Sequence, residues 1–182
     1  MSKPFSFFWE VGKIALIAFV LVAALRLFVF QPFLVRGASM EPNFHNWDYL
    51  IVDEISYRFR DPGRGEVVVF KFPNDPSQRY IKRIVGLPGE TVQVQEGQVT
   101  IFRGEEVLEL DESSYVSSDT PGSVKITLEN GEYFVMGDNR RSSSDSRSWG
   151  TLREDLIIGR VLFRVFPWSA FAKVGSPDYE SL

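Results

Sequence analysis

Hydrophobic and polar residues follow two different patterns along this chain. Residues 14–30 form an almost unbroken apolar run, IALIAFVLVAALRLFVF, in which Arg26 is the single charge. A helix with this sequence would be apolar on all sides, and its length lies at the lower end of the range for a membrane-spanning helix. Pro32 cannot donate a backbone hydrogen bond and favours an extended residue before it, so we expect the helix to end there.

Beyond Pro32 the pattern changes to short runs rich in Val, Ile, Phe and Tyr, separated by Gly, Pro, Asn and Asp. This pattern is typical of β-strands joined by tight turns. Because helical periodicity is missing, we predict a mainly β fold, an antiparallel and partly barrel-like domain over residues 31–182. The expected strands are 49–54, 66–72, 80–85, 91–95, 99–103, 107–110, 124–128, 133–136 and 159–166.

Turn and capping signals lie between these strands. Residues 95–98 are expected to close a β-hairpin, and the Asn-Gly pair at 130–131 predicts a second turn. Thr151, with Glu154 three residues later, predicts a short helix that begins with a capping box.

Two segments are predicted to lie outside the packed core. Residues 104–122 are polar and are interpreted as a surface excursion between sheet elements. Its acidic pairs, at 105–106 and 111–112, could form a metal or glycosidase site, but a solvated face is favoured. Residues 173–182 are expected to be a frayed tail.

The apolar run is interpreted as a retained membrane anchor. Lys3 and Lys13 precede it and acids follow it, which favours a cytoplasmic N-terminus and an outward-facing domain. A cleaved signal peptide is the first alternative, but the run is longer than usual and lacks a prompt cleavage motif. A buried core helix is the second. We therefore expect residues 1–30 to be a cytoplasmic N-terminus and single-pass anchor, in the cell membrane or a thylakoid membrane.

Composition narrows the possible chemistry. The chain has 182 residues and a net charge of −4, without a block of Lys or Arg, so we do not expect it to bind nucleic acid. It has no cysteine, which excludes disulfides, thiolate metal sites and a thiol nucleophile. No metal-ligand cluster and no glycine-rich phosphate loop are evident, so no cofactor is predicted.

Ser39 and Lys82 are the main candidates for catalysis. Ser39 follows Gly37 and Ala38, small residues that allow a substrate chain to approach closely. A serine hydroxyl needs a base, and the chain has a single histidine. Lys82, in a predicted strand with an apolar face, can act as that base only if burial lowers its pKa by several units. Taken separately, either residue would be read as an ordinary turn serine or surface lysine.

A third polar cluster occupies residues 137–150, GDNRRSSSDSRSWG. Asp138, Asn139, Arg140, Asp145 and Arg147 offer carboxylate–guanidinium pairs and side-chain-to-backbone bonds that can order a loop. Either serine at 143–144 could hold the lysine amine through a hydrogen bond. The density of complementary groups favours an ordered loop over a solvated one.

Together these segments resemble the bacterial type I signal peptidases (leader peptidases). The resemblance covers nearly the whole chain: FVFQPF at 28–33, SMEP at 39–42, YIKRIVGLPGE at 80–90 and GDNRRSSSDSR at 137–147. It implies a membrane-anchored serine endopeptidase that removes signal peptides from exported preproteins, with Ser39 as nucleophile and Lys82 as general base. It also implies supporting roles for Ser143, Asp145 and Arg147, and a substrate cleft lined by Phe33, Val35, Met40, Tyr80 and Ile81.

Two positions depart from the family motif. Asn43 stands where Thr commonly follows the SMxP proline, and Gly37 stands where some members carry a hydroxyl residue that helps to bind the oxyanion. The oxyanion site is therefore expected to depend on the Ser39 backbone N–H and on a second donor that the sequence does not identify.

Several other interpretations remain open. His45 could form a triad with Asp138 or Asp145, although a surface position is favoured. The aromatic residues at 163, 166, 168 and 171, with Phe44 or Trp47, fit a core and a membrane interface equally well. A self-cleaving repressor of the SOS type is the alternative enzyme, and a membrane-anchored β module without catalysis is the alternative class.

Overall fold

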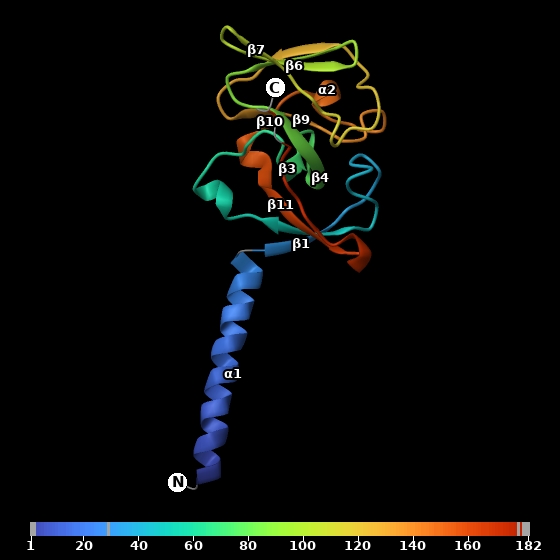
Figure 1. Cartoon of the computed structure of the whole chain (residues 1–182). Helices are drawn as coiled ribbons and strands as arrows, with labels where there is room; N and C mark the ends of the chain where they lie inside the picture. Colours follow the sequence, from blue (N-terminus) through green and yellow to red (C-terminus); the bar gives the residue numbers. More distant parts are fainter. Residues whose placement is uncertain (1–2, 29, 178, 180–182) are drawn as a thin grey trace.

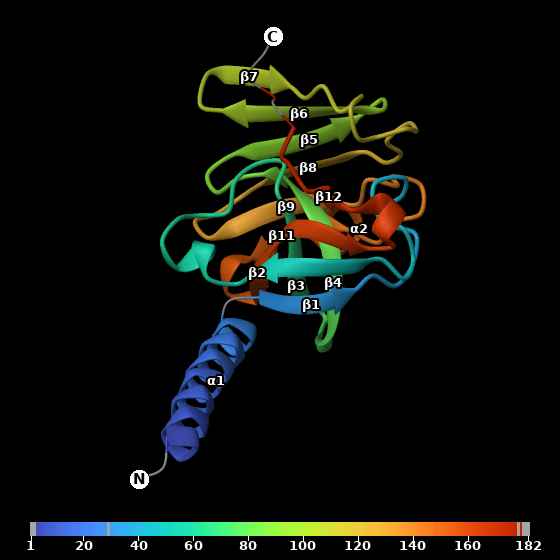
Figure 2. The same ribbon diagram turned by 60° about the horizontal axis from the view of Figure 1, so that its bottom comes forward.

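The computed structural model describes residues 3–28, 30–177 and 179. It consists of one long helix, α1 (Lys3–Phe28), and a body of two antiparallel β-sheets. Figures 1 and 2 show α1 standing away from the strands, with the four-stranded sheet at the opposite end of the body. The fold is therefore mainly β, as predicted.

The larger sheet has eight strands in the order β1-β2-β11-β3-β4-β9-β10, and β12 pairs with β11. This path ends at β1 and β10, and its strand pairs are antiparallel, as predicted. The strands are β1 (Phe30–Leu34), β2 (Tyr49–Asp53), β3 (Val67–Phe72), β4 (Asp75–Gly86), β9 (Glu132–Met136), β10 (Leu152–Arg153), β11 (Ile157–Phe166) and β12 (Ala172–Lys173).

The smaller sheet has four strands in the order β7-β6-β5-β8. Its central hairpin turns at Glu96 and Gly97, whose φ angles of 52° and 85° suit the tight two-residue turn that was predicted. The Asn-Gly turn at 130–131 also forms, as the connection between β8 and β9. The strands are β5 (Thr91–Gln95), β6 (Gln98–Arg103), β7 (Glu106–Glu109) and β8 (Val124–Thr127).

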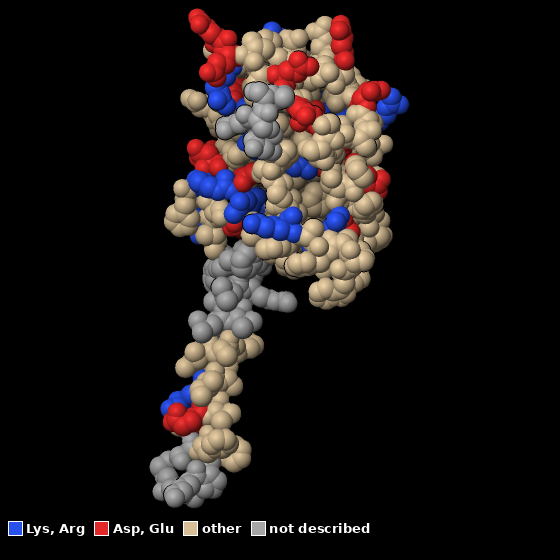
Figure 3. Space-filling model, viewed as in Figure 1, with Lys and Arg blue, Asp and Glu red and all other residues tan. Residues whose placement is uncertain are grey.

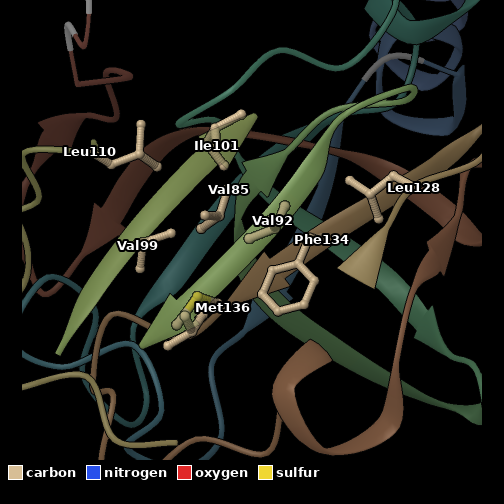
Figure 4. Close-up of a cluster of buried hydrophobic side chains, with 9 residues drawn as sticks. Val85, Val92, Val99, Ile101, Leu110, Leu128, Phe134 and Met136 are labelled. Carbon is tan, nitrogen blue, oxygen red and sulfur yellow. The ribbon is translucent and has the colours of Figure 1, made fainter. Parts of the chain in front are cut away.

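The two sheets share an apolar cluster, which Figure 4 shows in close-up. Val92 and Ile101 of the smaller sheet meet Val85, Phe134 and Met136 of the larger sheet, and all five are at most 2% exposed. Two further buried clusters lie in the larger sheet, one around Val35 and Leu50 and one around Phe70 and Ile84. Burial of this apolar area is the main term that stabilises the body.

Strand β4 is the element that matters most for the site. Its outer half, 76–79, is exposed, whereas residues 82–86 are all buried between neighbouring strands. Lys82 lies opposite Val68 of β3 in the antiparallel register, so its side chain starts from the middle of the larger sheet. A polar residue in that place needs a partner.

Some local predictions were wrong. Thr151 does not begin a helix: its hydroxyl donates to Glu132, β10 follows directly, and residues 154–156 form only a 3-10 turn without a side-chain cap. β1, β10 and β12 were not expected as strands. Pro32 lies within β1, an edge strand, where its missing N–H breaks no ladder. The helical segments outside α1 are α2 (Ser146–Trp149), η1 (Ser56–Arg58), η2 (Glu154–Leu156) and η3 (Trp168–Ala170).

The polar excursion and the tail are more ordered than predicted. Within 104–122, β7 pairs with β6 and confirms the strand expected at 107–110, whereas the burial of Leu110, Tyr115 and Thr120 was not expected of a surface excursion. The tail begins with β12, and residues 174–177 and Tyr179 pack back against the body. Both segments acquire their structure from distant partners, which local composition does not reveal.

The described side chains of α1 are exposed, including Phe7, Phe8 and Trp9. Judged on the part of the chain that the structure describes, no helix is long and apolar enough to cross a membrane. Figure 3 shows one face of the body, where most Asp and Glu side chains gather over the smaller sheet and a run of Lys and Arg lies nearer to α1.

Candidate active site

Ser39 lies in the turn that connects β1 to β2. Backbone bonds within this turn, from Glu41 N–H to Ala38 O and from Phe44 N–H to Met40 O, fix its shape. The Ser39 carbonyl accepts the Asn139 N–H at 3.0 Å, and the Asn139 side chain donates to Ala38 O at 3.1 Å. The loop that follows β9 therefore fixes the serine turn through bonds to its backbone.

The Lys82 amine reaches this serine directly. Its Nζ lies 2.7 Å from Ser39 Oγ and 2.9 Å from the Ile81 carbonyl oxygen, and 5.5 Å from the centre of the Tyr80 ring. Only 3% of the residue is exposed. Burial lowers the pKa of the Lys82 amine to about 8, against the opposing attraction of Asp145 and Asp138.

Arg83, the next residue on β4, points to the other side of the strand and holds Asp138. Its guanidinium makes two bonds to the Asp138 carboxylate, at 2.8 and 2.7 Å, and a third to the Gly65 carbonyl. Asp138 also accepts a bond from the Asn43 amide at 2.8 Å. Strand β4, the serine turn and the loop after β9 are thus joined at one buried carboxylate.

Asp145 organises the end of the same loop. Arg147 donates to both of its oxygens at 2.8 Å, and the Gly137 N–H donates at 3.1 Å. Burial opposes the ionisation of Asp145, but the Arg147 guanidinium holds its pKa below the ordinary value. Asp145 also accepts the Arg147 N–H as the N-cap of α2, so this short helix begins where the loop ends.

Ser143 lies beside the pair but is not one of the two hydrogen-bond partners of the amine, which are Ser39 Oγ and Ile81 O. Its surroundings are tight: a Cβ added to Gly137 would come within 2.3 Å of Ser143 Oγ and 2.4 Å of the Ser39 carbonyl oxygen. Glycine is required at position 137 because the serine turn and the loop meet across its bare backbone. Ser144 lies instead on the cleft wall.

An open cleft of about 710 Å³ leads to the pair. Its walls are the segment after β1 and the outer half of β4, and they include Phe33, Val35, Gly37, Tyr80 and Ile81. Met40, which was expected in this cleft, is only 1% exposed and packs in the cluster around Val35.

The charges on the cleft walls all have one sign. Arg36, Arg79 and Lys82 line the cleft together with neutral residues, and the Arg79 guanidinium lies 5.4 Å from the Phe33 ring centre. Because this wall contains no Asp or Glu among the described residues, the cleft is positive although the chain is negative overall.

Three functional contacts were missed from the sequence. Asn43, noted only as a departure from a motif, bonds to Asp138 and to the Tyr115 carbonyl. Arg83, for which no role was predicted, proves to be the partner of Asp138. Glu112, interpreted as solvated, makes a bidentate ion pair with buried Arg140 at 2.6 Å. In the sequence, the only signal for the two ion pairs was the presence of opposite charges, which does not show which residues pair.

The competing chemistries find no support in the geometry. His45 is exposed, and its backbone N–H bonds to Asp48. Among the described residues, no three His, Asp or Glu side chains are grouped closely enough to hold a metal ion.

This chain is similar to known proteins over most of its length. A family model described as "Signal peptidase, peptidase S26" matches residues 8–168. A probable signal peptidase I-1 from Synechocystis is 36% identical over 97% of this chain and 91% of its own length. A signal peptidase I from Bacillus amyloliquefaciens is 37% identical over 89% of this chain and 90% of its own length.

A crystal structure of a signal peptidase I from Enterococcus faecalis also matches, with 30% identity and a TM-score of 0.47 over 56% of this chain and 97% of its own. The family match spans every strand from β1 to β11 and every segment of the site described above. This chain therefore belongs to the type I signal peptidases, the serine endopeptidases of the S26 family that remove signal peptides from exported preproteins.

Proposed function

We propose that Ser39 is the nucleophile and Lys82 the general base of this peptidase. The observation that carries the proposal is the 2.7 Å contact between Lys82 Nζ and Ser39 Oγ at a buried position. A neutral amine at this distance can accept the hydroxyl proton as the oxygen attacks a carbonyl carbon. Arginine could not replace it, because a guanidinium does not lose its proton in the accessible pH range.

The reaction then runs in two stages. Ser39 Oγ attacks the scissile carbonyl while its proton moves to Lys82 Nζ, and the tetrahedral intermediate collapses as the ammonium donates that proton to the leaving amine. The amine leaves as the new N-terminus of the mature protein. Water next attacks the acyl-enzyme, with Lys82 again accepting a proton, and the signal peptide leaves as a carboxylic acid. The Ser39 N–H is the proposed oxyanion donor.

Asp138, Asn139, Asp145 and Arg147 are proposed as positioning residues. Asn139 bonds to the backbone of the serine turn, while the two carboxylates take part in ion pairs that keep the loop closed. Ser143, which lies beside the pair, is proposed to accept a bond from the ammonium when Ser39 is acylated.

The preprotein is proposed to bind in an extended conformation along the cleft. The exposed outer half of β4 and the segment after β1 offer free strand edges, to which a substrate backbone can add by β-augmentation. Val35, Tyr80 and Ile81 line this cleft, and they are proposed to form shallow apolar pockets for small side chains before the scissile bond. Gly37 allows the substrate to approach the serine closely.

We also propose that residues 1–30 anchor the enzyme in a membrane, with a cytoplasmic N-terminus, and that residues 31–182 act on the outer face. Support comes from the exposed apolar side chains of α1 and from Phe166, Trp168 and Phe171 on the body, which are 46%, 78% and 59% exposed. Surfaces of this kind favour lipid contact. Protease protection of the body in sealed inverted vesicles, with digestion in spheroplasts, tests this orientation.

Cleavage of a preprotein tests the catalytic assignment. Ser39→Ala and Lys82→Ala are expected to lose activity by at least a thousandfold while keeping the circular dichroism spectrum of the native protein. Lys82→Arg should be equally inactive. Lys125→Ala, which removes an exposed lysine of β8, is the matched control and should cleave normally. Full activity of either Ser39→Ala or Lys82→Ala would contradict the assignment.

A further inference from the structure

The C-terminal segment, residues 174–177 and Tyr179, returns to the body, where it packs against Gly65 and Tyr115. Figure 2 shows it leaving β12 and running across the body towards the smaller sheet. Val174 N–H donates to the Leu162 carbonyl at 2.8 Å. Tyr179 packs against the apolar cluster between the sheets, and its hydroxyl donates to the Tyr115 hydroxyl at 2.7 Å.

Tyr115 connects the C-terminal segment to the catalytic loop through two sets of contacts. Its hydroxyl donates to Glu112 at 2.6 Å, and Glu112 holds both terminal nitrogens of Arg140 at the same distance. Arg140 Nε in turn donates to the Gly137 carbonyl at 3.0 Å. Four buried or half-buried groups thus connect the C-terminal segment to the start of the loop.

The second set of contacts leads to the serine turn and to β4. The Tyr115 carbonyl accepts the Asn43 amide at 2.8 Å, and its ring lies 4.3 Å from the guanidinium carbon of Arg83. Asn43 and Arg83 are two of the groups that hold Asp138. Tyr115 therefore contacts Asn43 and Arg83, which hold Asp138, as well as Glu112, which holds Arg140.

The surroundings of Gly65 show independently that the C-terminal segment packs closely against the body. Its carbonyl accepts a bond from Arg83, and its φ of +81° favours glycine. A Cβ at this position would come within 2.8 Å of Pro177 and 3.0 Å of Tyr179. The C-terminal segment therefore packs directly on the backbone that supports Arg83.

We propose that Tyr179 is a positioning residue, which acts through Tyr115 to hold loop 137–140 and the Ser39–Lys82 pair in their reactive arrangement. The inference rests on the proposed roles of Ser39 and Lys82. Burial raises the pKa of Tyr179 to about 12, so its hydroxyl keeps the proton that it donates throughout the working pH range. Neither tyrosine is among the residues that line the cleft, so we expect the effect to fall on the chemical step and not on substrate binding.

Tyr179→Phe removes the hydroxyl alone and is the main test. We expect kcat for preprotein cleavage to fall about fivefold with KM unchanged, because the loop loosens while the cleft stays intact. Tyr115→Phe should give a similar loss, and the double variant little more, since both substitutions break one chain of contacts. Tyr179→Ala should lower kcat further, about twentyfold.

The pH profile separates positioning from general destabilisation. The charges that act on the Lys82 amine are Asp145 and Asp138, and the facing residue on β3 is neutral Val68. A loosened loop admits water to the amine, so the half-maximal pH of kcat/KM should rise in Tyr179→Ala. Leu108→Ala, which removes apolar packing from the same cluster on β7, is the control for stability and should change neither kcat nor this pH.

The outcomes distinguish the two proposals. If the Tyr179 variants lower the melting temperature but keep native kcat and pH profile, as expected of Leu108→Ala, the positioning role is overturned. Should Ser39→Ala cleave normally in the same assay, the catalytic assignment itself fails. Loss of kcat in Tyr179→Phe at native KM, with Ser39→Ala inactive, supports both.

Discussion

Lys82 makes the pH dependence of cleavage the most direct test of this site. Its pKa is lowered from 10.5 to about 8 by burial. At pH 7 about a tenth of the amine is then neutral, whereas an exposed lysine would be neutral in roughly 0.03% of molecules. The buried position therefore supplies roughly 300-fold more active base near neutrality, equivalent to about 3 kcal/mol.

The expected result is a rate that follows the neutral amine. At low preprotein concentration, cleavage should increase about tenfold per pH unit up to pH 7 and reach half its maximum near pH 8. The measurement is kcat/KM for one purified preprotein between pH 5.5 and 10 at constant ionic strength. A rate that is flat between pH 6 and pH 9 would refute lysine as the base.

Asp145→Asn tests the direction of the neighbouring charge. The Asp145 carboxylate raises the pKa of Lys82, so its removal should move the half-maximal pH downwards. The plateau rate should also fall, because Arg147 loses its charged partner. Asp155→Asn, in an exposed pair with Arg153, is the matched control and should leave the profile unchanged. An upward shift in Asp145→Asn would contradict the electrostatic account.

Three further predictions concern stability, packing and substrate charge. Between pH 8 and 10.5 the unfolded chain binds a proton at Lys82 that the native protein does not. The free energy of unfolding should therefore rise with pH by up to about 3 kcal/mol. Denaturant titrations over this pH range should show a smaller rise for Lys82→Met. Gly137→Ala should abolish cleavage, because its Cβ would meet the Ser39 carbonyl oxygen at 2.4 Å; a kcat within twofold of native would contradict this contact. Arg79→Glu and Arg36→Glu each replace a positive charge on the cleft wall by a negative one. Either variant should raise the ratio of cleavage rates, for substrates with lysine before the scissile bond over matched glutamate substrates, by about three- to tenfold. An unchanged ratio would contradict the positive cleft.

The sequence was sufficient for the elements that local patterns define. Expected strand 91–95 coincides with β5, where Val alternates with polar residues, and expected strand 159–166 lies within β11, which is rich in Val and Phe. Family membership also decides between the enzyme classes, against both the self-cleaving repressor and the non-catalytic binding module. Ser39 and Lys82 were singled out from residue chemistry, and the structure brings them together.

Features that depend on distant partners were not predictable in this way. Tyr115 and Glu112 lie in a segment whose composition indicates solvent exposure, but their burial depends on Arg140 and Arg83, which come from other elements. Tyr179 lies in a polar tail and is fixed by a hydroxyl contact to a residue 64 positions away. No local periodicity encodes such contacts.

A lysine base imposes a requirement that explains why so many ion pairs surround this site. Its amine must be dry enough to stay neutral, yet the attack creates an ammonium that needs negative charge nearby. An unpaired carboxylate in contact with the amine would raise its pKa and keep it protonated, and therefore inactive as a base. Asp138 and Asp145 avoid this because each forms an ion pair, with Arg83 and Arg147 respectively. The arginine cancels part of each negative charge, so the remaining attraction on the Lys82 amine is weaker. The ion pairs therefore set the pKa of the base as well as the shape of the loop, and a variant that breaks either pair should change both together.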